Sequence, residues 1–97
     1  MKQGLFEWDD VKAQSNLAKH GVSFEVSRSA FEDLFALDLL DADSGQGEIR
    51  YVIIGMVNGV LLTVVYTERG DRIRIISSRK ATAHEEKEYY RSQTAES

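Results

Sequence analysis

Apolar and polar residues alternate along the second half of the chain, and this pattern predicts an antiparallel β-meander. Residues 50–57 and 60–67 are rich in β-branched side chains, and Asn58-Gly59 between them is a strong hairpin signal. We expect a second turn at Arg69-Gly70 and a third strand from Arg72 to about Ser77. These strands should form the platform of the fold.

Helical spacing of apolar residues predicts two short helices in the first half. Asp9 or Asp10 can cap the first helix, which runs from Val11 to His20, and Gly21 follows where a left-handed residue often ends a helix. Ser23 can cap the second helix. The apolar stripe of this second helix consists of Phe24, Ser27, Ala30, Phe31 and Leu34. Both helices are amphipathic, so they should pack on one face of the sheet.

Shorter elements complete the prediction. Residues 5–8 and 36–40 can form short strands, and residues 41–47 have the composition of a loop. The predicted fold class is α+β, with two N-terminal helices packed on one face of an antiparallel meander and a C-terminal helix.

The C-terminal helix is expected from about Ala83 to Arg91. Thr82 and Glu85 before and within its first turn have the spacing of a capping box. Residues 92–97 should be frayed.

Two-residue turns determine the expected register of the meander. Tyr51 pairs with Tyr66 in the first hairpin, and Tyr66 pairs with Ile73 in the second. The same face also carries Ile53, Gly55, Leu62, Val64 and Ile75. Because this face is apolar, the helices should cover it.

Arginines converge on the opposite face in this register. Arg50 and Arg72 align in one row across the strands, and Arg74 lies in the next row. The doublet Ile75-Ile76 indicates a bulge or the end of pairing, and a bulge would turn Arg79 towards the same face.

Charge is divided unevenly between the two halves of this 97-residue chain, whose formal net charge is -4. Residues 1–48 carry a net charge of -6 and residues 49–97 a net charge of +2, so a basic surface belongs to the second half. The length suits a single domain over residues 1–97. The absence of cysteine, of a signal-peptide pattern and of a long apolar run favours a cytoplasmic protein without a membrane span.

The residues alone leave two interpretations of the arginines open. Arginine suits phosphate oxygens, so the cluster can form a nucleic-acid site. Alternatively the arginines only solvate an open sheet face and pair with surplus acids, and spacing by itself favours this second interpretation. His20 and Lys19 end the first helix, where a histidine is more often structural than a general base. No metal site is predicted, because Asp41, Asp43 and Glu48 lack the full pattern of a calcium loop.

Several blocks of the sequence, in order from about residue 6 to 90, resemble the BrnT family of bacterial type II toxins. The specific blocks are KHGVSFE at residues 19–25 and IRIISSRKAT at residues 73–82. The supporting blocks are FEWD at 6–9, FED at 31–33, EIRY at 48–51 and TERGD at 67–71.

The resemblance implies a RelE-like fold and a ribonuclease that inhibits translation and needs no cofactor. It also implies a cognate antitoxin with a ribbon-helix-helix part, which neutralises the toxin and binds operator DNA in complex with it. The catalytic residues that it implies are Arg72, Arg74, Arg79 and His20. The candidate substrate-binding residues are Arg50, Lys80 and Lys19, which the resemblance implies, and Arg69.

The leading hypothesis is RNA cleavage without a metal ion, in which the 2′-hydroxyl of the substrate attacks the adjacent phosphorus and the arginines stabilise the developing charge. His20 and Glu68 are the candidates for the general base. A rival hypothesis is a non-catalytic binding module whose arginine-lined face docks an acidic or helical segment of a partner protein. Direct DNA binding is disfavoured because no predicted helix is basic enough to enter a major groove.

Overall fold

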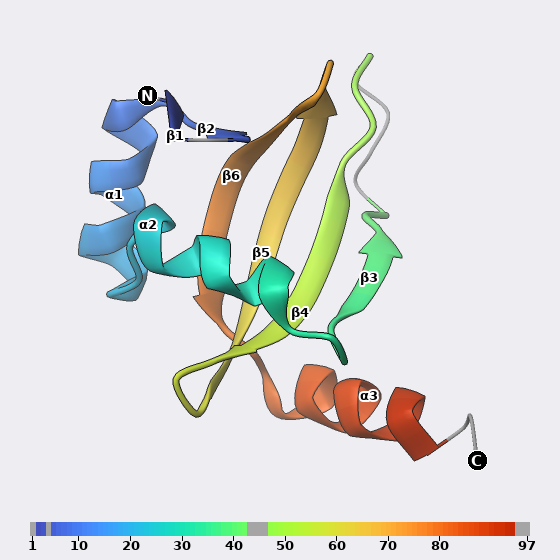
Figure 1. The fold of residues 1–97 in the computed structure, drawn as a ribbon. Coiled ribbons are helices and arrows are strands. Elements are labelled where there is room, and N and C mark those ends of the chain that lie inside the picture. The colour runs from blue at the N-terminus through green and yellow to red at the C-terminus, as the bar shows by residue number, and fades with distance from the viewer. Residues whose placement is uncertain (1, 4, 43–46, 95–97) are drawn as a thin grey trace.

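The computed structural model describes residues 2–3, 5–42 and 47–94, and in this part of the chain helices pack against a six-stranded sheet (Figure 1). The strands are β1 (Lys2–Gln3), β2 (Phe6–Glu7), β3 (Leu37–Leu40), β4 (Tyr51–Val57), β5 (Val60–Arg69) and β6 (Arg72–Lys80). The helices are α1 (Asp10–His20), α2 (Phe24–Ser27), the 3₁₀ helix η1 (Arg28–Glu32) and α3 (Ala83–Thr94). The predicted α+β class is confirmed.

The sheet is mixed, because a parallel strand pair that was not predicted adds to the predicted antiparallel meander. Its strands lie in the order β1-β2-β6-β5-β4-β3. β4, β5 and β6 form the expected meander, but β2 pairs in parallel with β6. β2 is only two residues long, and a segment this short carries no periodic signal that could have revealed its partner.

Local signals predicted α1 correctly. The carboxylate of Asp9 accepts a hydrogen bond from the amide of Val11. Gly21, with a φ of 72°, ends the helix, and its amide donates to the carbonyl of Leu17 at 2.8 Å.

The buried side chain of Asn16 attaches α1 to β6. Its Nδ2 donates to the carbonyl of Ser78 at 2.8 Å and to the carbonyl of Val22 at 3.0 Å. Its Oδ1 accepts from the amide of Ser78 at 3.1 Å. α1 therefore lies along the end of β6 that β2 does not cover.

The predicted second helix is only partly correct. Ser23 caps it as expected, since its Oγ accepts from the amide of Val26 at 3.1 Å. The α-helix ends at Ser27, however, and the chain continues as η1. Leu34 was wrongly assigned to the buried stripe, because its side chain is 95% exposed.

The second hairpin is shifted by two residues from the predicted register, whereas the first is as predicted. Arg69 pairs with Arg72, so the turn consists of Gly70-Asp71. The φ of 61° at Gly70 suits the first position of such a turn. Tyr66 consequently lies opposite Ile75 and not opposite the predicted Ile73.

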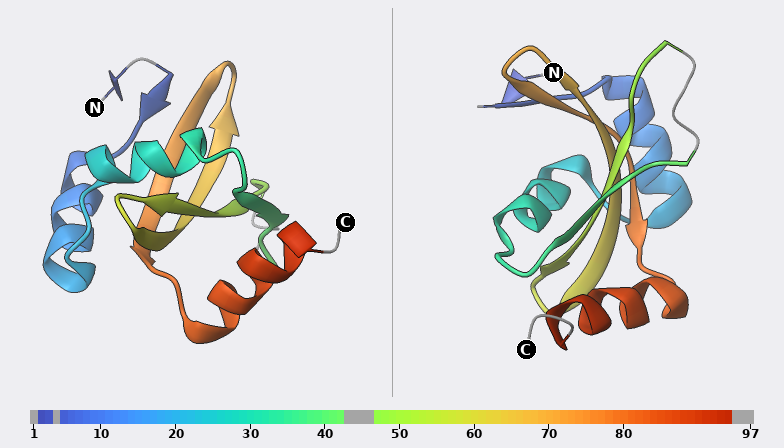
Figure 2. Two further views of the ribbon diagram at one scale, coloured as in Figure 1. Left: turned by 60° about the horizontal axis from the view of Figure 1, so that its bottom comes forward. Right: turned by 90° about the vertical axis from the view of Figure 1, so that its right-hand side faces the viewer.

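Helices cover both faces of the sheet, but unequally (Figure 2). The larger core contains Trp8, Val22, Phe24, Ala30, Ile53, Val57, Leu62, Val64, Tyr66 and Ile75. The smaller core, on the other face, contains Ile54, Leu61 and Tyr89. α2 and η1 therefore pack on the first face, and α3 covers one end of the second face (Figure 2).

Asp33 connects the end of η1 to β4 and α3. Its carboxylate accepts hydrogen bonds from the amides of Phe35 and Met56 and, at 2.6 Å, from the hydroxyl of Tyr89. Burial raises the pKa of Asp33, but these hydrogen bonds outweigh it and hold the pKa below its ordinary value. Burial and the bond to Asp33 raise the pKa of Tyr89 to about 12.

Thr82 and Glu85 form the predicted capping box of α3. The amide of Glu85 donates to Thr82 Oγ1 at 3.2 Å, and the amide of Thr82 donates to Glu85 Oε1 at 2.8 Å. α3 continues to Thr94, so residues 92–94 are helical and not frayed.

Some expectations fall on residues outside the described part. These are the end of the frayed segment, at residues 95–97, and part of the predicted loop, at residues 43–46. None of the described helices is long and apolar enough to cross a membrane.

Candidate functional site

A β-bulge lies near the middle of β6. Tyr66 pairs with Ile75 and Val65 pairs with Ser77, so Ile76 is an extra residue on β6. The extra residue reverses the alternation of side chains for the remainder of the strand.

The bulge brings the arginines of β6 to one side. Arg72 and Arg74 precede it, Arg79 follows it, and all three lie on the sheet face opposite the larger core. On a regular strand Arg79 would point to the other side from Arg74. We call this surface, formed by Arg72, Arg74, Ser77 and Arg79, the arginine face.

Arg50, directly before β4, lies on the same side of the sheet as the arginine face, but in a different row from the predicted one. The register of β4 and β5, extended by one residue, places Arg50 opposite Thr67, whose partner on β6 is Arg74 and not Arg72. Thr67 Oγ1 donates to the carbonyl of Ile49 at 2.6 Å and so holds this segment against β5.

Carboxylates from other elements pair with several of these arginines. Arg74 Nη1 lies 3.0 Å from Glu7 Oε2 on β2, and Arg69 Nη2 lies 3.0 Å from Glu48 Oε2. These pairs are the counter-charges that the second interpretation of the sequence expected. A phosphate that binds Arg74 must compete with Glu7 for the guanidinium group.

Glu85 forms the most extensive of these contacts. Its two carboxylate oxygens accept from Arg79 Nη1 and Nη2 at 2.8 and 3.0 Å, and Oε1 also accepts from Thr63 Oγ1 at 2.9 Å. The hydrogen bonds from Arg79, together with those from Thr82 and Thr63, outweigh burial and lower the pKa of Glu85 to about 2. The hydrogen bonds to Glu85 also raise the pKa of Arg79. Both groups are therefore charged at neutral pH.

His20 and Lys19 lie beside the bulge of β6. Together with Lys12, Ser15 and Asn16 of α1 they line a hollow of about 200 Å³, which is closed on the other side by Ile76 and Ser77. Since Ser77 belongs to the arginine face, the fold brings the basic side of α1 next to it.

Two predicted residues lie away from the arginine face. Lys80 is opposite Leu62 and so points to the other side of the sheet from its neighbour Arg79. Glu68 lies on the side of Tyr66, and its charge contributes to the raised pKa of that tyrosine. Of the two candidate bases, His20 borders the arginine face through Ser77, whereas Glu68 lies on the opposite side of the sheet. Among the described residues, no group of three or more His, Asp or Glu side chains is arranged to hold a metal ion.

The sequence did not predict that Lys12, Glu7 and Glu85 lie next to the arginine face. Lys12 could have been found, because residues 12 and 19 are separated by about two helical turns and lie on one side of α1. The two glutamates reach the arginines through strand pairing and helix packing over long sequence distances, which no local pattern indicates.

The fold and this surface define a small α+β protein with an arginine-lined sheet face. The chain belongs to the family described as ribonuclease toxin, BrnT, of type II toxin-antitoxin system, whose family model matches residues 8–85. The match includes α1, the whole meander and the capping box of α3. No curated protein matches the chain. The resemblance to this family is thus confirmed, and a ribonuclease toxin of a type II system is the function that the family indicates.

Proposed function

We propose that the protein is an endoribonuclease toxin that binds RNA on the arginine face and cleaves it without a metal ion. The observation that carries the proposal is the bulge of β6, which gathers Arg72, Arg74 and Arg79 on one side of a rigid sheet. Guanidinium groups held in this way can bind a phosphodiester and stabilise the additional charge of its transition state.

The proposed reaction uses the RNA itself as the nucleophile. The 2′-hydroxyl oxygen forms a bond to the adjacent phosphorus while the bond from phosphorus to the 5′-oxygen of the next nucleotide breaks. His20 accepts the proton of the 2′-hydroxyl, and a proton is delivered to the leaving 5′-oxygen. The products are a 2′,3′-cyclic phosphate and a free 5′-hydroxyl.

Substrate binding would extend beyond the β6 arginines. Arg50 and Arg69 lie at the same end of the sheet as Arg72 and Arg74 and can position the RNA backbone. Lys12 and Lys19 continue the positive surface along α1. Lys80 is the weakest member of the proposed set, because it points to the other side of the sheet.

The proposal includes a partner and a biological setting. Cleavage of cytoplasmic RNA would inhibit translation, and a cognate ribbon-helix-helix antitoxin would neutralise the toxin. The complex of the two would bind operator DNA through the antitoxin. Membership of a type II toxin-antitoxin family supports the RNA target and the cognate antitoxin.

Replacing both leading arginines tests the proposed chemistry. In Arg72→Ala/Arg74→Ala, cleavage of single-stranded RNA in the presence of EDTA should fall by at least about 100-fold, as expected when transition-state charge loses its donors. Arg28→Ala/Arg91→Ala, which removes two arginines from η1 and α3, is the matched control and should retain cleavage. Unchanged cleavage by the first variant would contradict the assignment.

The ion pairs of the arginine face favour one alternative function. Arg74 and Arg79 already pair with the carboxylates of Glu7 and Glu85. The carboxylates of an acidic segment of a partner protein could pair with the same arginines. In that case the protein is a non-catalytic binding module. Absence of RNA cleavage by the wild-type protein, with no growth arrest when it is expressed, would support this alternative.

A further inference from the structure

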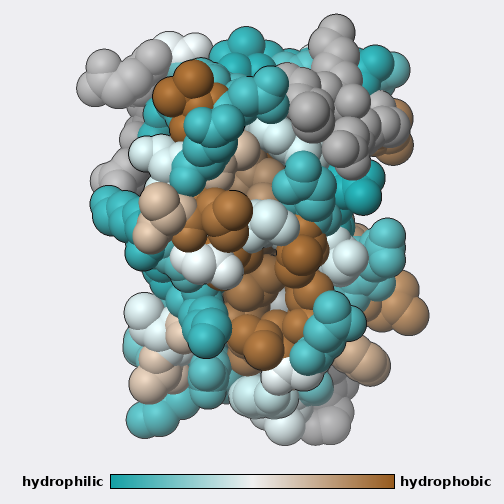
Figure 3. Space-filling model, turned by 90° about the vertical axis from the view of Figure 1, so that its left-hand side faces the viewer, coloured by the Kyte–Doolittle hydropathy of each residue, from teal (hydrophilic) through white to brown (hydrophobic). Residues whose placement is uncertain are grey.

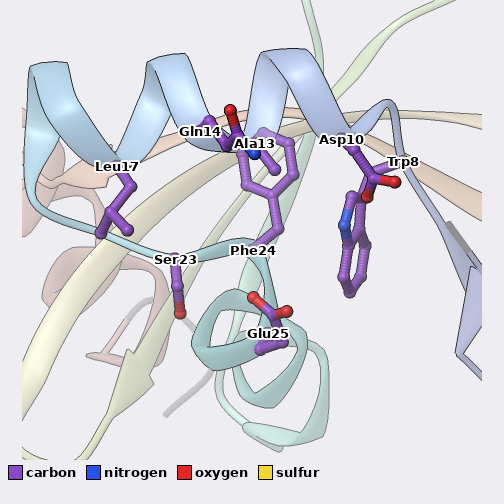
Figure 4. A pocket seen from close by; sticks show the side chains of 8 residues that line it. All are labelled: Trp8, Asp10, Ala13, Gln14, Leu17, Ser23, Phe24 and Glu25. Carbon is purple, nitrogen blue, oxygen red and sulfur yellow. The ribbon is translucent and has the colours of Figure 1, made fainter.

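α1 presents different chemistry on its two sides. The side with Lys12 and Lys19 borders the hollow at β6, next to the arginine face. The side with Asp10, Gln14 and Leu17 borders a second pocket, which lies between α1 and the start of α2 (Figure 4). The helix thus separates a basic surface from an acidic and apolar one.

The pocket between α1 and α2 has a volume of about 360 Å³ and is lined by both apolar and polar residues. Trp8 and Phe24 lie in it with their rings edge to face at a centroid distance of 6.0 Å, and both are buried. Ala13 and Leu17 of α1 complete the apolar lining (Figure 4). Such a volume accommodates one large apolar side chain, or the apolar edge of a helix.

Apolar surface continues outside the pocket. Leu17 is 51% exposed and Val26 is 46% exposed, although both lie beside this opening or on the adjoining α2. On the side of the molecule that carries α1, apolar residues gather around a hollow (Figure 3). Exposed apolar groups around a concave site are typical of surfaces that bind other proteins.

The opening of the pocket is acidic. Asp10 and Glu25 both line it and are exposed, and neither has an ion-pair partner among the described residues. Gln14 and Ser23 add polar groups without positive charge. An RNA phosphate would be repelled here, whereas a lysine or arginine would be attracted.

We propose that this pocket binds an amphipathic segment of the cognate antitoxin, which packs an apolar side chain on the exposed Leu17. Lysine or arginine residues that flank this side chain pair with Asp10 and Glu25. The assignment of the partner rests on the proposed function, and the chemistry of the segment follows from the charge and shape of the pocket.

The position of the pocket explains how one partner could also block the proposed active surface. An α-helix with its side chains is about 10 Å wide, so only the width of α1 separates the pocket from the basic side that adjoins the arginine face. An antitoxin anchored in the pocket needs only a short further segment to cover the arginines.

Charge reversal at the opening tests the inference. The probe is the purified product of the open reading frame that adjoins the gene of this chain. Glu25→Lys should weaken its binding to the full-length protein by about ten-fold, because an attraction becomes a repulsion. Glu86→Lys is the matched control, since Glu86 is also an exposed glutamate in the first turn of a helix, and its affinity should change by less than about two-fold.

A second variant and an internal reporter keep the test independent of folding. Gln14→Lys adds a positive charge on α1 and should also weaken binding, and circular dichroism melting should show both variants folded. Trp8 is the single tryptophan of the chain and lies in the pocket, so its fluorescence should change when the antitoxin binds. Unchanged affinity in both lysine variants, or unchanged Trp8 fluorescence in the complex, would overturn the inference.

RNA cleavage measured in parallel separates the two proposals. Both lysine variants should cleave RNA at the wild-type rate, because neither residue belongs to the arginine face. If the wild-type protein cleaves no RNA but Glu25→Lys still loses the antitoxin, the proposed reaction fails and the docking site stands. If Glu25→Lys instead converts a dimer of this chain into a monomer in sedimentation, the pocket binds a second copy and the antitoxin assignment is wrong.

Discussion

At the scale of single residues, Glu85 connects the arginine face to α3. Its carboxylate accepts hydrogen bonds from Arg79 on β6 and from Thr63 on β5, and it also caps α3 through Thr82. One side chain therefore connects two strands and a helix. It also determines whether Arg79 faces a carboxylate or is available to a phosphate.

The lowered pKa of Glu85 predicts a pH-dependent contribution to stability. Because the folded-state pKa of about 2 lies below the ordinary 4.5, the unfolded chain takes up this proton at a higher pH than the folded one. The contribution is complete above about pH 5 and is lost as the pH falls towards 2. Glu85→Gln should lower the free energy of unfolding by about 1 kcal/mol at pH 7, a modest value because Arg79 is partly exposed.

Denaturant titrations at pH 7 and pH 3 measure this effect. The difference in unfolding free energy between wild type and Glu85→Gln should shrink at pH 3. Glu86→Gln, which alters an exposed neighbour, should change stability little at either pH. A difference for Glu85→Gln that stays constant between the two pH values would contradict the prediction.

At the scale of elements, the close approach of η1 to β4 depends on Gly55. A Cβ atom at this position would lie 2.5 Å from the carbonyl oxygen of Ala30 and 3.1 Å from its Cα. Both obstructing atoms are backbone, so they cannot be moved aside by a rotamer change. The glycine thus allows η1 to pack directly on the sheet, with Ala30 fully buried.

Substitution of Gly55 should therefore separate η1 from β4. Gly55→Ala should lower the free energy of unfolding by about 2–3 kcal/mol through overpacking. Gly70→Ala provides a comparison, because its Cβ would meet nothing within 4 Å and only the φ of 61° opposes it, at about 1 kcal/mol. Thermal and denaturant unfolding of both variants would measure the difference. Equal destabilisation by the two substitutions would show that the Ala30 contact is easily relieved.

At the scale of the whole molecule, α1 divides two surfaces of opposite character. The arginines of β6 and the lysines of α1 lie on one side, and the acidic α1–α2 pocket lies on the other. A net charge of -4 therefore conceals a local basic surface. Long-range attraction of RNA should act on that surface and weaken with salt.

Lys12 should contribute to RNA binding through charge alone. Lys12→Ala should weaken the affinity for single-stranded RNA by about two- to five-fold and reduce the slope of log affinity against log salt by about one phosphate contact. Lys87→Ala on α3 is the matched control and should leave both values unchanged. The measurement is a salt series of binding titrations, and an identical salt slope for wild type and Lys12→Ala would exclude Lys12 from the RNA surface.

Much of the fold could be predicted because its signals are local. Asp9 and Gly21 bound α1, Asn58-Gly59 forms the first hairpin turn, and Thr82 with Glu85 caps α3 as expected. Each of these features depends on residues a few positions apart, where backbone propensity and capping dominate. The family, too, was recognisable from contiguous blocks of sequence.

The candidate site was predictable only in part. The convergence of Arg72, Arg74 and Arg79 follows from alternation combined with a bulge, which was one of the two interpretations of the doublet Ile75-Ile76. The position of Lys80 on the opposite side was missed, although the same alternation implies it. The carboxylates that pair with the arginines come from β2 and α3, and only tertiary packing brings them there.

The second turn shows where local pattern stops and tertiary structure begins. A shift of two residues preserves the alternation of faces, so turns at Arg69-Gly70 and at Gly70-Asp71 are equally compatible with the apolar pattern. The hydrogen bonds between Asn16 and Ser78, which are 62 residues apart in the chain, hold β6 in the observed register. The chain order of elements, their caps and the presence of a basic face are thus properties of the sequence itself. The tertiary structure decides which row each arginine occupies and which carboxylate it contacts. Both depend on contacts between residues far apart in the chain, which a local sequence pattern does not indicate.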